Sequence, residues 1–121
     1  MYKVSKRMEI AGSHQLELDY ESKCENLHGH NWIITVEVTG QKLDNNGMLI
    51  DFTAIKSIVK DRLDHKNLNE VLNFNPTAEN IAYWIANLID KFCDDSGRFD
   101  TWCSSVKVQE SEGNIAEWSR K

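Results

Sequence analysis

The sequence lacks the features that mark several classes of protein. It has one proline, six glycines and three cysteines in 121 residues, and it contains no Pro- or Gly-rich linker and no low-complexity tract. No apolar run approaches the ~20 residues that cross a bilayer, and the opening MYKVSKRMEI lacks the apolar stretch of a secretory signal. Positive charge is not in excess: 14 Lys and Arg against 19 Asp and Glu give a net charge of −5, whereas a general nucleic-acid binder has a basic surface.

The cysteines Cys24, Cys93 and Cys103 are an odd set without the spacing of a disulfide framework, which suits a reducing compartment. We therefore expect a cytoplasmic protein that binds neither membrane nor nucleic acid. The 40% hydrophobic and 27% charged residues are an ordinary globular balance. Without a repeat or a linker, we expect residues 1–121 to form a single domain.

Alternating apolar and polar residues predict two long strands in the first third of the chain. They cover residues 2–16 and 28–39, and in both the apolar side chains occupy mainly even positions. Two shorter alternating segments predict further strands at 106–109 and 115–119.

The apolar period changes to that of a helix between these pairs of strands. An apolar stripe over residues 52–63 follows Asp51, a candidate N-cap, and predicts the first helix. The second predicted helix begins after Thr77, a second candidate N-cap, and ends at Asp94-Asp95-Ser96-Gly97.

The order of these elements predicts an α+β fold with a four-stranded antiparallel sheet and two helices on one face, in the order ββααββ. We expect residues 64–76, between the helices, to be a polar loop. Such a sheet has two open edges, which must be paired or blunted. We therefore expect an oligomer that continues the sheet between subunits; a monomer with charged or twisted edges is the alternative.

Three histidines share one parity on the first two predicted strands. His28 and His30 lie two residues apart at the head of the second strand, so both imidazoles point to the apolar face. Antiparallel pairing of the two strands would bring His14 alongside them. Three imidazoles can hold zinc with one coordination position open, as in catalytic sites. The alternative is that each is an ordinary core or turn histidine.

Three further positions are candidates for chemistry. The adjacent Asp64 and His65 can form a proton-transfer pair, or be two solvated loop residues. Cys24 can be a base or nucleophile, a fourth metal ligand that closes the site, or an unremarkable thiol. Glu110 has the parity of the valines of its strand and would face the covered side, where a carboxylate needs a cation or the N–H groups of a ligand.

Five ordered motifs resemble the 6-pyruvoyl-tetrahydropterin synthase family, and most closely its bacterial 6-carboxy-tetrahydropterin synthase branch. The resemblance covers nearly the whole chain. The motifs are Cys24-Glu25-Asn26-Leu27-His28-Gly29-His30-Asn31-Trp32, Gly47-Met48-Leu49-Ile50-Asp51-Phe52, Leu63-Asp64-His65-Lys66-Asn67-Leu68-Asn69, Pro76-Thr77-Ala78-Glu79-Asn80-Ile81-Ala82 and Val108-Gln109-Glu110.

The resemblance implies a zinc ion bound by His14, His28 and His30, and Cys24 as the base that abstracts a proton. It also implies the tunnelling fold (T-fold), in which trimers close a β-barrel and two trimers stack into a homo-hexamer.

For the remaining positions, the resemblance implies that Asp64 and His65 form a catalytic proton relay. It implies that Glu110 is also a catalytic residue, whose carboxylate anchors the pterin ring by accepting two parallel N–H bonds from it. Because sites in this family lie between subunits, Thr77 is expected to contact a neighbour's ligand.

The implied substrate is 7,8-dihydroneopterin triphosphate, with Lys23, Lys66 and Arg7 as candidates for holding the phosphates. The carboxy branch gives 6-carboxy-tetrahydropterin, acetaldehyde and triphosphate on the route to queuosine, whereas the pyruvoyl branch only eliminates triphosphate. The three-residue gap between Cys24 and His28 resembles the carboxy branch. The alternatives are the pyruvoyl enzyme, a relative that cleaves dephosphorylated dihydroneopterin, and a non-catalytic zinc or pterin binder.

Overall fold

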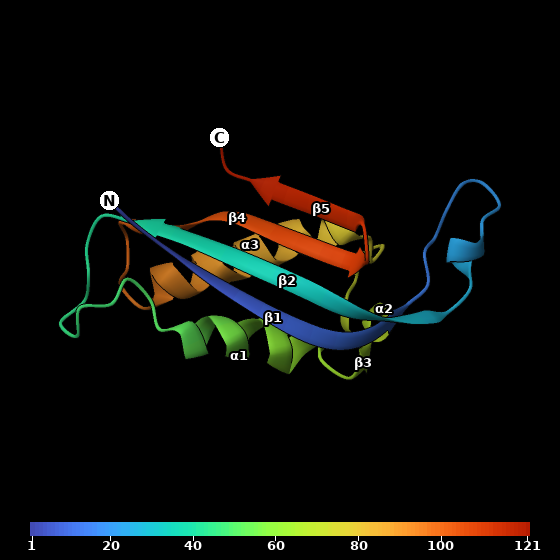
Figure 1. The fold of residues 1–121 in the computed structure, drawn as a ribbon, viewed down its shortest axis with the longest axis horizontal. Helices are drawn as coiled ribbons and strands as arrows, with labels where there is room; N and C mark the ends of the chain where they lie inside the picture. The colour runs from blue at the N-terminus through green and yellow to red at the C-terminus, as the bar shows by residue number, and fades with distance from the viewer.

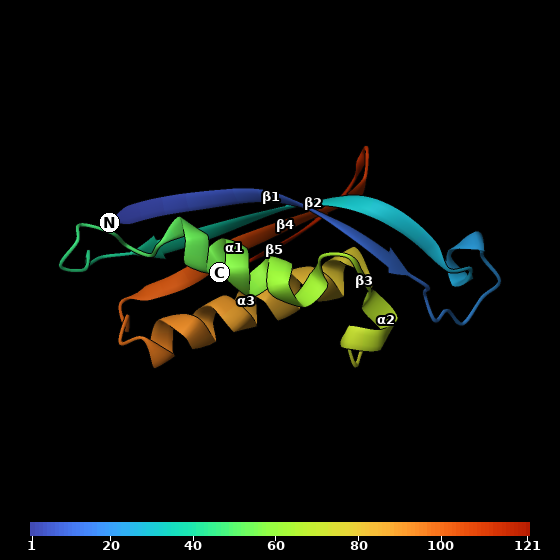
Figure 2. The ribbon, with the colours of Figure 1, turned by 90° about the horizontal axis from the view of Figure 1, so that it is seen from below.

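A five-stranded sheet forms one layer of the protein and the helices form the other (Figures 1 and 2). The computed structural model describes all residues, 1–121. The strands lie in the order β3-β1-β2-β4-β5. The elements along the chain are β1 (Tyr2–His14), the 3₁₀ helix η1 (Lys23–Glu25), β2 (His28–Gly40), α1 (Phe52–Leu63), β3 (Lys66–Asn67), α2 (Leu68–Val71), α3 (Ala78–Asp95), β4 (Thr101–Ser111) and β5 (Asn114–Ser119).

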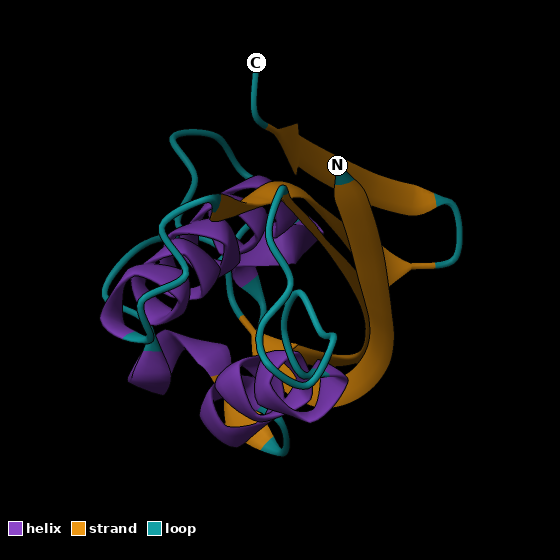
Figure 3. Cartoon of the chain, turned by 90° about the vertical axis from the view of Figure 1, so that its left-hand side faces the viewer, coloured by secondary structure: helices purple, strands orange, loops and turns teal.

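The two long strands predicted at the N-terminus are present and pair antiparallel, with His14 opposite His28 and Gly12 opposite His30. Their even-numbered side chains point toward the helices, and those of Trp32 and Ile34 are fully buried. Seen end-on in Figure 3, the sheet curves around the helices. A single cluster of 23 buried hydrophobic residues fills the space between the layers.

Both predicted helices begin at the expected caps. The Asp51 carboxylate accepts a hydrogen bond from the N–H of Thr53 at the start of α1, and the Thr77 hydroxyl accepts one from the N–H of Asn80 at the start of α3. Such caps satisfy N–H groups that have no partner within the helix. None of the helices is long and apolar enough to cross a membrane.

The prediction of four antiparallel strands and two helices was wrong in its count. Residues 64–76, predicted as a polar loop, contain the two-residue strand β3, which pairs parallel with β1 at Gly12 and Ser13, and the single-turn helix α2. Leu68 is fully buried in α2, beside Gly12. Elements of two and four residues are too short to show a hydrophobic period, so the sequence pattern could not reveal them.

Both edges of the sheet remain open in the single chain. β5 has no neighbour on its outer side, and β1 is paired on its outer side only at the two positions that face β3. The outer edge of β1 therefore offers unpaired backbone groups along most of its length.

Candidate functional site

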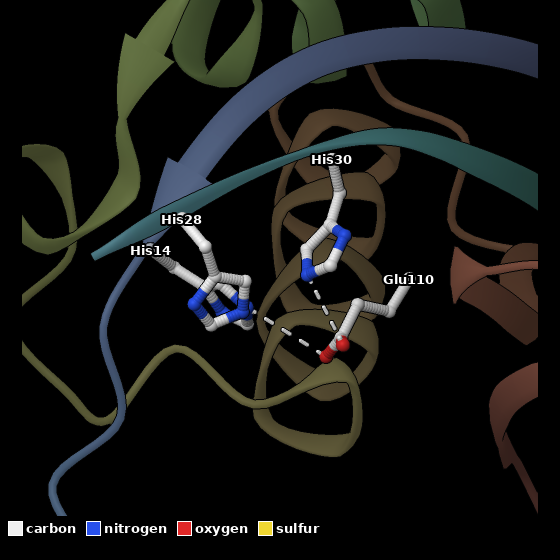
Figure 4. Close-up of side chains that lie close together, drawn as sticks. All are labelled: His14, His28, His30 and Glu110. Carbon is white, nitrogen blue, oxygen red and sulfur yellow. Dashed lines mark hydrogen bonds and ion pairs between the residues drawn. The ribbon is translucent and has the colours of Figure 1, made fainter. Parts of the chain in front are cut away.

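The three histidines meet where β1 ends and β2 begins (Figure 4). The antiparallel register and the shared parity place all three imidazoles on the helix side of the sheet, as predicted. His14 is completely buried, and Trp32 packs edge-on against the rings of both His14 and His30. The local sequence therefore fixes the direction of these side chains, and the strand pairing brings them together.

Glu110, near the end of β4, completes this cluster. The Nε2 atoms of His14 and His28 are 3.0 Å apart. The Glu110 carboxylate lies 3.2 Å from His30 Nε2 and 3.7 Å from His14 Nε2. One ligand atom from each of the four residues lies within 4.8 Å of all the others, so the group is compact enough to surround a single metal ion.

Backbone carbonyls orient two of the imidazoles. His14 Nδ1 lies 2.8 Å from the carbonyl oxygen of Pro76, and His28 Nδ1 lies 2.5 Å from that of Asn26. Because a carbonyl oxygen only accepts, both Nδ1 atoms must carry the proton, which leaves the Nε2 lone pairs pointing into the cluster. This is the arrangement by which surrounding groups prepare histidines for a metal.

The electrostatics of the cluster also suit a cation. Burial lowers the pKa of both His14 and His30, and this effect outweighs the opposing influence of the Glu110 carboxylate. The imidazoles are therefore held in the neutral form that binds metals. His30 Nε2 is buried and has no hydrogen-bond partner, since its 3.2 Å approach to Glu110 lacks hydrogen-bond geometry. Three imidazole nitrogens and a carboxylate are a donor set that fits zinc.

Cys24 lies apart from this cluster. It belongs to η1 in the loop between β1 and β2, which projects beyond the end of the sheet (Figure 1). Its thiol is free and exposed, and it is not among the grouped ligand atoms. Glu110, rather than Cys24, occupies the fourth position beside the histidines.

Asp64 and His65 form a pair at the edge of the sheet. Asp64 accepts a hydrogen bond from the N–H of Ala11 at 2.9 Å, and its other oxygen lies 3.6 Å from His65 Nε2. Burial alone would raise the pKa of Asp64, but the Ala11 N–H, His65 and Lys60 together lower it. The His65 side chain is 81% exposed, and its backbone has a positive φ of 58°. Neither residue is among the grouped ligand atoms; His65 lines an open groove of about 500 Å³, which His30 also lines.

A second groove, of about 320 Å³, borders the metal cluster. Glu110 lines it together with Ala78, Glu79 and the turn between β4 and β5. Thr77 adjoins this groove in sequence, but its hydroxyl accepts the N–H of Asn80 as the cap of α3. The predicted substrate-binding residues Glu110 and Thr77 thus flank the same end of α3.

Sequence reasoning missed two asparagines that hold the chain as it leaves His14. Asn69 accepts from the N–H of Gln15 and donates to its carbonyl, both at 2.8 Å. Asn75 makes the same pair of bonds with Glu17, at 2.9 and 3.0 Å. The two side-chain amides therefore bond to the backbone after β1 as a neighbouring strand would, and hold it as far as Glu17. No local pattern marks an asparagine for this role, because its partners lie more than 50 residues away.

Comparison with known proteins identifies the family of the chain. The family model described as 6-pyruvoyl tetrahydropterin synthase matches residues 3–121. The 6-carboxy-5,6,7,8-tetrahydropterin synthase of Bacillus subtilis is 28% identical over 117 residues, which cover 91% of this chain and 80% of that protein. The protein of the same name from Synechocystis is 37% identical over 94 residues, which cover 70% and 72%.

Solved structures share the fold. The 6-pyruvoyl tetrahydropterin synthase of Caenorhabditis elegans superimposes with a TM-score of 0.76 at 22% identity, over 99% of this chain and 96% of that one. An uncharacterized protein from Wolinella succinogenes gives 0.77 at 20% identity, over 99% and 98%. The expected T-fold is therefore present, and with the match over residues 3–121 the chain belongs to the 6-pyruvoyl tetrahydropterin synthase family.

Proposed function

We propose that this protein is a zinc-dependent 6-carboxy-5,6,7,8-tetrahydropterin synthase. It would convert 7,8-dihydroneopterin triphosphate to 6-carboxy-tetrahydropterin, acetaldehyde and triphosphate, a step toward queuosine. The observation that carries the proposal is the convergence of His14, His28, His30 and Glu110 at one point. Relatives that bear this enzyme's name and align with most of the chain support the choice of branch.

The residues divide the chemistry between them. His14, His28 and His30 would hold the zinc ion, which supplies a Lewis acid that lowers the pKa of substrate hydroxyls. Glu110 would hold the ring through the N–H groups of its aminopyrimidinone edge. Its place at the border of both the metal cluster and the adjacent groove suits that task.

Proton transfer would fall to Cys24 and to the Asp64–His65 pair. Asp64 is held in place by the Ala11 N–H and its pKa is lowered, so it stays ionised and can orient the His65 imidazole. Cys24 and His65 are both exposed and lie outside the metal cluster of their own chain. A site that a neighbouring subunit completes would account for this exposure.

Assembly into a homo-hexamer, a dimer of trimers, is part of the proposal. The open edges of β1 and β5 support it, because they would otherwise leave backbone hydrogen-bonding groups free for uncontrolled pairing. Native mass spectrometry measures the subunit number directly. A monomer at working concentration would contradict both the assembly and the shared site.

The deciding experiment is mass spectrometry of the products after the zinc-loaded protein is incubated with 7,8-dihydroneopterin triphosphate. We expect carboxy-tetrahydropterin and acetaldehyde. Pyruvoyl-tetrahydropterin would favour the second candidate, the activity for which several structural neighbours are named. Unchanged substrate would favour a protein that only binds zinc or pterin.

A pair of variants tests the role of Cys24. We expect Cys24→Ala to abolish turnover while zinc and pterin binding persist, because the thiol lies outside the grouped metal ligands. Glu21→Gln, an exposed change in the same loop, is the control and should remain active. Full activity of Cys24→Ala would remove Cys24 from the mechanism.

A further inference from the structure

Glu110 is a carboxylate without a permanent cation. Its side chain is only 24% exposed, and His14 and His30 are the only basic groups within 4.0 Å of it. No Lys or Arg lies within 4.0 Å of the carboxylate, so no permanently charged side chain balances its charge. A carboxylate removed from water without a cation or hydrogen-bond donors is costly. A metal ion among these four residues would supply the missing charge.

The spacing of the ligand atoms supports direct contact with a metal. In a tetrahedral zinc site with bonds of about 2.0–2.2 Å, neighbouring ligand atoms lie ~3.3–3.5 Å apart. The distances here are 3.0 Å between the Nε2 atoms of His14 and His28, and 3.2 and 3.7 Å from the Glu110 oxygens to His30 and His14. All three are close to the tetrahedral value, and no other Cys, Asp or Glu joins the group.

The backbone at Glu110 directs its side chain both toward the histidines and into the groove beside them. Gln109 pairs with Ile115 and Ser111 pairs with Asn114, so Glu110 is the extra residue of a β-bulge at the end of the β4–β5 ladder. Bulges redirect a side chain relative to the regular alternation of a strand. The same carboxylate that reaches the histidines also lines the 320 Å³ groove beside them, and Figure 4 shows it extending from the end of β4 toward His30.

We propose that, before substrate binds, Glu110 is the fourth ligand of the metal held by His14, His28 and His30, and that it leaves the metal to accept the N–H groups of the pterin ring. This inference rests on the proposed function. The exchange would couple recognition of the ring to the opening of a coordination position. The resting site would be closed, and a molecule without the aminopyrimidinone edge would not open it.

Cobalt(II) in place of zinc reports the coordination without any turnover, because its visible absorption depends on the number and kind of ligands. We expect Glu110→Ala to change the visible spectrum of the cobalt protein. We also expect it to weaken cobalt binding at least ~10-fold, the effect typical even for groups that only support a metal ligand. Glu79→Gln is the matched control, because Glu79 lines the same groove but is not among the grouped ligand atoms. Identical spectra of wild type and Glu110→Ala would overturn the proposal.

Titration with unsubstituted pterin tests the exchange in the wild-type protein, where folding of a variant is not a concern. Pterin has the aminopyrimidinone edge but no hydroxylated side chain. We expect its binding, followed by quenching of its fluorescence, to shift the cobalt spectrum with the same midpoint. Binding without a spectral shift would overturn the exchange. Absence of pterin binding would overturn the exchange, while product analysis still decides the proposed function and the spectrum of Glu110→Ala still decides whether Glu110 is a ligand.

Discussion

Replacing Asn69 or Asn75 with Ala removes the hydrogen bonds that hold the chain as it leaves His14. Each amide makes two bonds to the backbone, Asn69 to Gln15 and Asn75 to Glu17. The segment that they hold connects the end of β1 to the loop that carries Cys24. We therefore expect these variants to lose stability and to hold metal less tightly.

The size of the effect follows from the number of bonds. A hydrogen bond contributes about 0.5–1.5 kcal/mol net, and these bonds are exposed, so water can replace part of each. Two bonds per side chain give a loss of about 1–2 kcal/mol for each variant. Since both amides hold the same short segment, we expect the double variant to lose less than the sum. If the whole loss reached the metal site, affinity would fall about 5- to 30-fold, because ~1.4 kcal/mol is one factor of ten.

Urea unfolding of the metal-free protein, at one fixed protein concentration because assembly shifts apparent stability, measures the first effect. Zinc titration calorimetry measures the second. Asn73→Ala is the control, because Asn73 lies between the two asparagines, is exposed and makes no side-chain hydrogen bond. Equal unfolding midpoints and zinc affinities for all three single variants would refute the reasoning.

Two further predictions concern pH and packing. Burial lowers the pKa values of His14 and His30 from 6.5, so the unfolded chain binds more protons than the folded one near that pH. We therefore expect the free energy of unfolding of the metal-free protein, measured in urea, to fall as the pH drops below about 6.5. A constant free energy of unfolding from about pH 7.5 to 5.5 would contradict this. A Cβ at Gly40 would lie 2.5 Å from a methyl carbon of buried Leu49, so Gly40→Ala should lower the free energy of unfolding by about 1–3 kcal/mol. Gly29→Ala is the control, because a Cβ there meets open space, and thermal unfolding should show a clearly smaller loss of stability. Equal losses in the two variants would show that the structure around Gly40 relaxes.

Local patterns predicted the parts of the fold that depend on neighbouring residues. The alternation of the first two strands placed His14, His28 and His30 on the buried face, and the antiparallel register confirmed that they meet. Asp51 and Thr77 were identified as caps because a cap acts only on the turn that follows it. The roles assigned to the site residues remain predictions.

Contacts between distant segments could not be predicted from local patterns. Glu110 lies 80 residues beyond His30 in the sequence, and only the pairing of β2 with β4 and the bulge in β4 bring it beside the histidines. Asn69 and Asn75 hold backbone more than 50 residues away, and β3 exists only because it lies against β1. Which side chains face the core on each element follows from local periodicity, so it could be read from the residues of that element. The fourth member of the metal cluster depended on contacts that form only when the whole sheet is assembled.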